Sequence, residues 1–331
     1  MCRIYFGVFL EPQEKSWGFF LTSSMLSLFL MDNKISSDQW IKCISTQGNI
    51  RGVAINATEL VQTIADRHLL QGSMIQALGE TVMGALLVAS YCKPGERVNL
   101  NVRGSGLVKQ ALADAYPEGT VRGYVIENQT PVHSKEETGP WGSGLLSILK
   151  TRDEEAGKPY IGTVPLITGF LPKDLSFYWA QSEQIPSAVG LAVNFEGNKV
   201  ISAGGFLVQA LPGASPLEVQ TIEQHIHEIQ SLASSFATDG DPLHLLSQIF
   251  QSTAFVIIDK KPVTFKCNCS WERVERALVL IGAQELQDIL TQNKEIIVRC
   301  DFCAHEYQVS LSELKRLIKV TQQSADQTTH N

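Results

Sequence analysis

Four of the seven cysteines in this chain form two close pairs near the C-terminus. Cys267 and Cys269 are separated by one residue, and Cys300 and Cys303 are separated by two. Turns of this length aim both sulfurs of a pair the same way, so the two pairs can converge on one tetrahedral metal ion. Cysteine pairs at this spacing can also be redox-active. The pattern therefore predicts a metal site, a redox site, or both.

Zinc is the metal that we expect at these four thiolates, with one ion per reduced chain. His305 is close enough to be an alternative ligand, but four cysteines already complete a tetrahedral site. The other cysteines, Cys2, Cys43 and Cys92, have no partner at motif spacing. An odd total argues against an extracellular disulfide framework, so we predict a reducing, cytoplasmic location. Cys43 and Cys92 are expected to be small hydrophobic core residues rather than nucleophiles.

The overall composition is that of a folded protein with a sizeable core. Of the 331 residues, 44% are hydrophobic and 18% are charged, and the length suffices for two domains. The net charge of −7 argues against a general electrostatic attraction to nucleic acid or to an anionic membrane. We therefore predict neither as a partner.

Residues 1–35 are interpreted as an extension that precedes the folded chain. Its apolar run at 17–31 is too short for a transmembrane helix, and no small-x-small cleavage site follows it. An export signal is thus disfavoured. A start codon placed too far upstream, with translation from Met25 or Met31, is the favoured interpretation.

Residues 36–210 are predicted to form one N-terminal core domain of α+β or α/β class with a mostly antiparallel sheet. Apolar residues recur at helical spacing over 58–68, behind a threonine cap, and over 73–92. Gly104 and Gly106 lack the third glycine of a phosphate-binding loop, so a hairpin turn is favoured. Strands are expected at 98–102, 121–126, 191–195 and 200–211, the last two as a hairpin, and a helix at 173–181.

Residues 211–261 are predicted to be a metastable helical linker. A long amphipathic helix is expected over 215–236, followed by a break at 239–242 and a short helix through Leu246 and Phe250. Such a stretch has few partners of its own, so it must lie on a neighbouring domain that stabilises it.

Residues 262–320 are predicted to be a small zinc-binding domain, with a disordered polar tail at 321–331. A core of about 60 residues is marginal by itself, whereas structural zinc supplies roughly 10–16 kcal/mol that exists only in the folded state. Zinc would therefore decide whether this domain folds. The expected elements are a helix capped by Ser270 over 273–280, a helix over 284–290, and strands at 296–298 and 307–309.

Known catalytic signatures are missing from the sequence. It contains neither a G-x-S-x-G elbow nor an H-E-x-x-H helix, and His225 and His227 cannot share one helix face. We therefore predict that the protein is not an enzyme.

The stretch from Phe265 to Arg273, together with Val298 to Cys303 and Tyr307, resembles the zinc domain of the 33 kDa chaperonin family. The resemblance extends over about residues 36–320. Trp271 departs from it, since the family usually has a polar residue there, and the first 30 residues have no family counterpart. Further matching stretches are Ala77 to Glu80, Gly95-Glu96, Gly104 to Gly106, Val121 to Tyr124, Ser182 to Pro186 and Gly204-Gly205.

The resemblance implies a redox-regulated, ATP-independent holdase chaperone for unfolding or oxidatively damaged client proteins. It implies that the reduced, zinc-bound form is inactive. Oxidation would release zinc, partly unfold the chain and activate it, with disulfides Cys267–Cys269 and Cys300–Cys303. A homodimer is one state that we consider for the active form.

Two other functions remain open from the residues alone. A four-cysteine zinc ribbon can bind nucleic acid, but the stretch 259–319 mixes acidic and basic residues without a basic stripe. A thiol-disulfide oxidoreductase is the enzymatic alternative. Its C-x-x-C pair usually starts a helix after a strand, whereas a hairpin is expected here.

Overall fold

The computed structural model describes residues 2–5, 38–131, 139–152, 159–229, 231–232, 236, 240–292 and 296–328. The chain divides into two compact units: a core unit, Ser37–Cys267, and a C-terminal unit of Asn268–Asn331 with Met1–Ser36. The apolar run at 17–31, with both alternative start sites, lies outside the described residues. Within the described ranges, no helix is long and apolar enough to cross a lipid bilayer.

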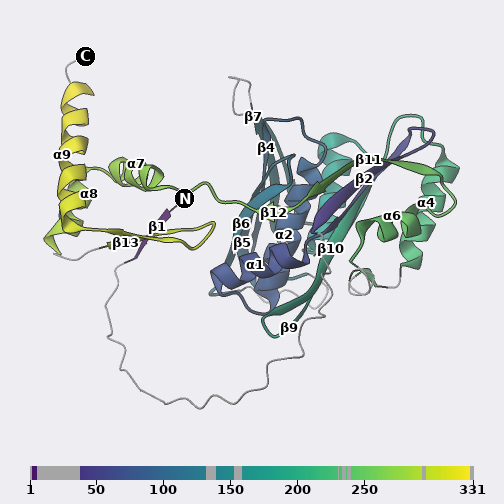
Figure 1. Ribbon diagram of the computed structural model, residues 1–331, viewed down its shortest axis with the longest axis horizontal. Helices are drawn as coiled ribbons and strands as arrows, with labels where there is room; N and C mark the ends of the chain where they lie inside the picture. Colours follow the sequence, from purple (N-terminus) through teal and green to yellow (C-terminus); the bar gives the residue numbers. More distant parts are fainter. Residues whose placement is uncertain are drawn as a thin grey trace, which may run out of the picture. The chain divides into compact units, whose positions relative to one another are not determined.

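The core unit contains two sheets whose neighbouring strands are antiparallel in all pairs but one (Figure 1). The exception is β12, which lies parallel to β6. The five-stranded sheet has the order β11 (Phe255–Pro262), β2 (Gln39–Ser45), β3 (Ile50–Asn56), β10 (Lys199–Ala210), β9 (Ser187–Glu196). The six-stranded sheet has the order β12 (Thr264–Phe265), β6 (Thr120–Glu127), β5 (Val108–Ala115), β4 (Glu96–Gly104), β7 (Gly144–Arg152), β8 (Tyr160–Pro165).

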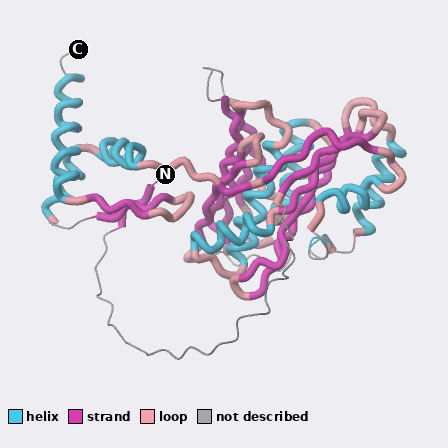
Figure 2. The backbone as a smooth tube through the Cα atoms, in the orientation of Figure 1, coloured by secondary structure: helices cyan, strands magenta, loops and turns pink. Residues whose placement is uncertain are grey.

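Helix α2 (Ser73–Ala89) lies between the two sheets and contacts strands of both (Figures 1 and 2). Fifteen of its 17 residues are buried, because a helix covered on both sides needs apolar or small residues all round. α1 (Thr58–His68) and α3 (Leu171–Tyr178) pack beside it. The main core of the protein is therefore a sheet–helix–sheet sandwich.

Neighbouring side chains in the five-stranded sheet point to opposite faces, and apolar residues on the outer face are covered by a further layer of helices. Trp40, Val53 and Leu207 face the main core, whereas their neighbours Ile41 and Phe206 belong to a second apolar cluster. That cluster is completed by α4 (Pro216–Glu228) and α6 (Pro242–Phe250), which cover the outer face of the sheet.

Most of the predicted core elements are confirmed. The helices predicted at 58–68 and 73–92 are α1 and α2, the 173–181 helix is α3 with a following π turn, η1 (Trp179–Glu183), and the hairpins at Gly104 and at 191–211 are present. The threonine cap of α1 is wrong. Ala57 occupies the N-cap position, and the Asp38 carboxylate accepts the Leu60 backbone N–H at 2.6 Å instead.

The long helix predicted over 215–236 is shorter in the structure. α4 ends at Glu228, because Ile229 adopts an extended backbone. The Phe236 ring packs directly over Gly204, where any side chain would collide with it. The predicted helix is therefore interrupted at Ile229, although Leu232 and Phe236 are again helical among the described residues.

The predicted helical linker also contains a strand that the sequence analysis missed. β11 pairs with β2, with Ile257 opposite Cys43 and a register shift before Asp259. Three successive residues of β11, Val256, Ile257 and Ile258, are each about half exposed at this sheet edge.

Where it is described, the C-terminal unit contains a three-stranded sheet and three helices around a cluster of ten buried apolar residues. The tail prediction is wrong for 321–328, because α9 continues through them: Leu314, Leu317 and Ile318 anchor its buried side, and no proline or glycine stops it. The extension contributes a strand that was not predicted. The elements are β1 (Cys2–Tyr5), β13 (Ile296–Cys300), β14 (Glu306–Val309), α7 (Trp271–Ile281), α8 (Ala283–Thr291) and α9 (Leu311–Thr328).

A substitution at Gly119 can measure how closely the segment before the cysteines packs against the turn that precedes β6. Its φ of +95° favours glycine, and a Cβ there would collide with the Pro262 carbonyl oxygen. We expect Gly119→Ala to lower the free energy of unfolding by about 2–4 kcal/mol, from backbone strain plus the collision. Urea unfolding followed by circular dichroism measures this.

The matched control is Gly95→Ala. Gly95 has a φ of +79° and nothing within 4 Å of an added Cβ, so only the backbone strain of about 1–2 kcal/mol is expected. An equal decrease in the free energy of unfolding in the two variants would contradict the close packing of Pro262 against Gly119.

Candidate metal centre

The four cysteines of the two pairs are carried by the ends of regular elements. Cys267 comes two residues after β12, and Cys269 directly precedes Ser270, the N-cap residue of α7. Cys300 is the last residue of β13, and Cys303 lies in the turn that leads to β14. Each pair is thus held at a rigid element rather than in a long loop.

The four sulfur atoms all lie within 4.8 Å of one another. The Cys269 and Cys303 sulfurs are 3.4 Å apart. Zinc–sulfur bonds of about 2.3 Å in a tetrahedron would place the sulfurs about 3.8 Å apart, so the donor set fits a structural zinc ion. Among the described residues, this is the one group of three or more cysteine, histidine or carboxylate side chains found close enough to share a metal.

The second pair sits in a tight hairpin turn. The Cys300 backbone N–H donates to the His305 carbonyl at 2.9 Å, and Ala304 N–H donates to the Cys300 carbonyl at 2.9 Å. Ala304 adopts a left-handed φ of +58° to close this turn. The C-x-x-C pair therefore does not begin a helix. A position at a helix N-terminus is the arrangement that lowers the pKa of an oxidoreductase thiol.

Burial differs between the pairs. Cys300 and Cys303 are only 3% and 6% exposed, whereas Cys267 and Cys269 are half-buried. An oxidant in solution therefore has readier access to the C-x-C pair than to the C-x-x-C pair.

Tyr307 is a part of this centre for which the sequence analysis predicted no role at the cysteines. Its pKa is raised above the usual range, first by burial, and then by a hydrogen bond to the Cys269 sulfur and the negative charge of the neighbouring thiolates. The aromatic ring lies between His305, at 4.6 Å between ring centroids, and Trp271, at 6.3 Å. Tyr307 lies in the strand that follows the C-x-x-C turn, where alternate side chains share one face of the sheet. This position is the sequence signal that could have suggested a role at the site.

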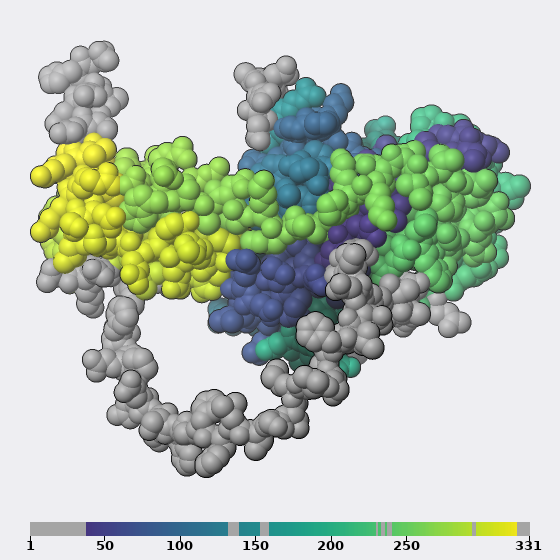
Figure 3. Space-filling model, viewed as in Figure 1, coloured from purple at the N-terminus to yellow at the C-terminus, as the bar shows by residue number. Residues whose placement is uncertain are grey.

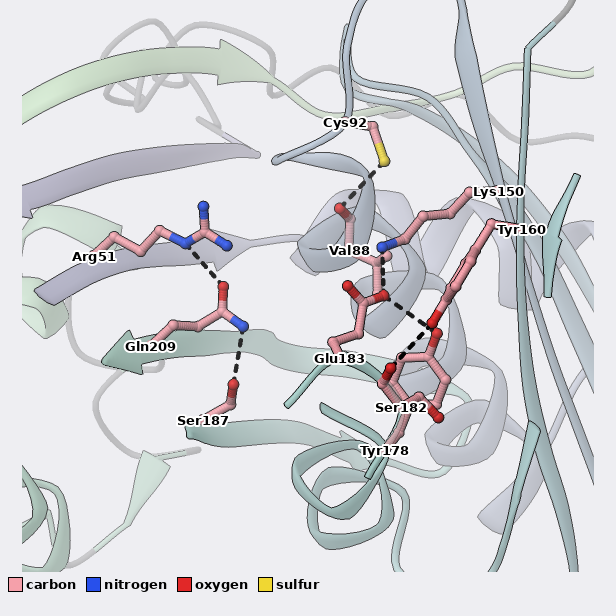
Figure 4. Close-up of polar contacts among 10 residues, drawn as sticks. All are labelled: Arg51, Val88, Cys92, Lys150, Tyr160, Tyr178, Ser182, Glu183, Ser187 and Gln209. Carbon is pink, nitrogen blue, oxygen red and sulfur yellow. Dashed lines mark hydrogen bonds and ion pairs between the residues drawn. The ribbon is translucent and has the colours of Figure 1, made fainter. Parts of the chain in front are cut away.

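Cys43 and Cys92 lie apart from the centre. Cys43 is fully buried beneath α6, as predicted, and burial raises its pKa to about 12. Cys92 is only half-buried, because it lines a polar cavity of about 150 Å³ beside η1 (Figure 4). Burial also raises the pKa of Cys92, to about 11.

The charged side chains that line the cavity beside Cys92 have polar or charged partners. Figure 4 shows Lys150 pointing at Glu183, with 2.5 Å between nitrogen and oxygen, and Arg51 donating to Gln209 at 2.9 Å. Gln209 in turn donates to Ser187 at 2.9 Å. No thiolate, metal group or nucleophile–base pair forms there among the described residues.

The family model described as Hsp33 protein matches residues 38–310. The chain belongs to the Hsp33 family. The 33 kDa chaperonin of Levilactobacillus brevis is 33% identical over 296 residues, which cover 86% of this chain and 99% of that protein. The 33 kDa chaperonin of Geobacter sulfurreducens is 34% identical over 290 residues, which cover 86% of this chain and 95% of that protein.

A solved structure agrees with both the sequence resemblance and the predicted fold class. The crystal structure of the 33 kDa chaperonin, a heat shock protein 33 homologue, from Thermotoga maritima superposes with a TM-score of 0.77 at 28% identity. The match covers 86% of this chain and 99% of that one. The α+β class with antiparallel sheets is confirmed.

The raised pKa values of Cys43 and Cys92 predict that both thiols stay inert in the native protein. At pH 8, roughly 0.1% or less of either would be thiolate, the reactive form. We expect iodoacetamide to leave both unmodified in native protein and to modify both after denaturation, as read by peptide mass spectrometry. Native alkylation of Cys43 or Cys92 at the rate of a free cysteine would show that these thiols are available to oxidants.

Proposed function

We propose that this protein is a redox-regulated, ATP-independent chaperone that holds unfolding or oxidatively damaged proteins and prevents their aggregation. Membership of the Hsp33 family supports a chaperone role. The observation that supports the redox part is the convergence of four thiols within 4.8 Å of one another. We place the protein in the cytoplasm, where thiols stay reduced without stress.

Cys267, Cys269, Cys300 and Cys303 would hold one zinc ion in the reduced protein. Bound zinc would keep the four sulfurs as thiolates, the form that peroxide or hypochlorous acid oxidises. The apolar core cluster described in the C-terminal unit has ten residues, so roughly 10–16 kcal/mol from a structural zinc site would dominate the stability of this unit. The reduced form is thus proposed to be folded and inactive.

Oxidation is proposed to form two disulfides, Cys267–Cys269 and Cys300–Cys303. For each disulfide, two thiolates give two electrons to one hydrogen peroxide molecule, which takes up two protons and leaves as two water molecules. The oxidised sulfurs are no longer thiolate ligands, so the stabilisation of the C-terminal unit is lost. Loop-closure cost favours these short rings, although a C-x-C disulfide is strained.

The segment directly before Cys267 connects the cysteines to exposed apolar residues of the core unit. Upstream of Cys267 lie β12 and then β11, whose residues form a surface band beside β2 in Figure 3. β11 already exposes Val256, Ile257 and Ile258. Loosening of this segment would expose the edge of β2 and apolar residues beside α6, and exposed apolar surface is what an unfolding client binds. Holding a client in this way requires no ATP and no catalytic turnover.

The first prediction concerns the metal. We expect reduced protein to contain one zinc per chain and a serine substitution at any of the four cysteines to weaken zinc binding by several orders of magnitude, because a closed tetrahedral site loses one of four thiolates. Chelator competition measures this. His305→Ala is the control and should retain zinc; loss of zinc in His305→Ala with retention in Cys267→Ser would show that the ligand set is wrong.

The second prediction concerns bond pairing after oxidation. Peptide mapping under non-reducing conditions should find Cys267 joined to Cys269 and Cys300 joined to Cys303. The 3.4 Å contact between the Cys269 and Cys303 sulfurs makes a crosslink between the pairs the competing product. If that crosslink dominates, the proposed pairing is wrong.

The third prediction concerns the activity. Peroxide at a mildly denaturing temperature should release zinc and only then suppress aggregation of an unfolded client, which light scattering records. Neither treatment alone should suffice at short times, because the buried pair requires local opening before it is oxidised. Equal suppression by reduced, zinc-loaded protein would leave a binding protein without a redox switch. A homodimer of the active form would appear in sedimentation of the same samples.

A further inference from the structure

A polar cavity of about 150 Å³ lies in the core unit at the C-terminal end of α2. Residues from both sheets line it, among them Arg51 on β3 and Lys150 on β7, together with Glu183 of η1. A cavity of this volume holds a molecule the size of benzene, which has about six non-hydrogen atoms. The cavity is therefore large enough for a small organic ligand.

Arg51 is held on one side of the cavity by two contacts. Its Nε donates to the Gln209 side chain at 2.9 Å, and Gln209, which is 1% exposed, donates in turn to Ser187 at 2.9 Å. The guanidinium carbon also lies 4.0 Å from the centre of the Tyr91 ring. Such contacts fix the plane of a guanidinium before any ligand arrives.

The outer edge of this guanidinium is available to a ligand. Among the described residues, neither terminal nitrogen of Arg51 has a hydrogen-bond partner, and the side chain has no carboxylate partner. Figure 4 shows the guanidinium directed toward Lys150 and Glu183. Two parallel N–H groups match the two oxygens of a carboxylate.

The opposite wall carries an ion pair whose charges cancel. Lys150 and Glu183 are 2.5 Å apart, and the Tyr178 hydroxyl donates to the same Glu183 oxygen at 3.4 Å. The lining thus has two cations and one carboxylate, which leaves one net positive charge. Because Lys150 and Glu183 are 26% and 19% exposed, solvent reaches this wall.

Tyr91 adds a neutral donor to the cavity. Its hydroxyl oxygen is buried and has no hydrogen-bond partner among the described residues. Buried polar groups are nearly always bonded, so a ligand oxygen at this hydroxyl would explain its position. Val88 and Trp179, each 4% exposed, supply apolar surface in the same cavity. A few polar groups beside apolar walls are typical of a small-molecule site.

We propose that this cavity binds a small monocarboxylate. Its oxygens accept hydrogen bonds from the terminal nitrogens of Arg51 and from the Tyr91 hydroxyl, and its carbon chain packs against Val88 and Trp179. One net positive charge suits a singly charged anion better than a phosphate, which carries close to two negative charges at neutral pH. None of the four clustered cysteines takes part, so the site does not depend on the chaperone function proposed above.

The test titrates butyrate, and the neutral butyramide of the same size, into reduced full-length protein labelled with fluorotryptophan. Fluorine NMR should show the Trp179 signal, assigned by its loss in Trp179→Phe, moving with butyrate at a dissociation constant of about 0.1–10 mM. Butyramide should bind about tenfold more weakly, because it lacks the charge. The signal of Trp271, which belongs to the C-terminal unit, is the internal control and should not move.

Three variants assign the binding to the named donors. Arg51→Gln should weaken butyrate binding about tenfold or more, whereas Arg103→Gln, on an exposed part of β4, is the matched control and should leave it unchanged. Tyr91→Phe should weaken binding about twofold to tenfold without lowering the midpoint of urea unfolding, since the hydroxyl has no partner in the ligand-free protein. A merely structural tyrosine would lower that midpoint.

Four results would overturn the proposal. They are an unmoved Trp179 signal with butyrate, equal affinities for butyrate and butyramide, unchanged butyrate affinity in Arg51→Gln, and tighter binding of inorganic phosphate than of butyrate.

Discussion

In the function that we propose, the stability of the C-terminal unit depends on one constraint: four sulfur atoms from two separate turns remain together. In the described part of this unit, the helices and the small sheet enclose one cluster of ten buried apolar residues, whereas the core unit buries apolar residues on both faces of a sheet. Conformational entropy opposes a small domain as strongly per residue as a large one. We propose that a metal bound to the four thiolates compensates for the small core, and that it does so only while the thiols stay reduced.

The position of the cysteines in the chain gives this local constraint a wider effect. Cys267 terminates the last segment of the core unit, and the two preceding strands close the edges of different sheets, β12 on β6 and β11 on β2. One continuous stretch of about a dozen residues therefore holds two sheet edges. Edge strands are the least protected part of a sheet, so they are suited to local opening.

Local sequence patterns predicted much of this fold, because many of its contacts join residues that are close in the sequence. The run of α2 is apolar on most of its circumference, with Glu80 and Thr81 as buried polar exceptions, and this pattern predicts a buried helix. The Gly104 turn and the 191–211 hairpin close between neighbouring strands. The cysteine spacing predicted the convergence of the four sulfurs, since each turn aims its own pair. These features needed no knowledge of distant contacts.

Features determined by distant contacts were missed. β12 has two residues and pairs with β6 more than a hundred positions away. α4 ends at Glu228, and Phe236 packs over Gly204, a residue of a distant strand. Propensity carries no information about such long-range partners.

The most direct test of the central claim is hydrogen exchange after removal of the metal by chelator in fully reduced protein. The account predicts that residues 268–328 lose protection, that β12 and β11 follow, and that α1, α2 and strands β4, β5, β6, β7 and β8 keep theirs. Full retention of protection in α7, β13 and β14 without the metal would contradict it, because the C-terminal unit would then be stable on its apolar core alone.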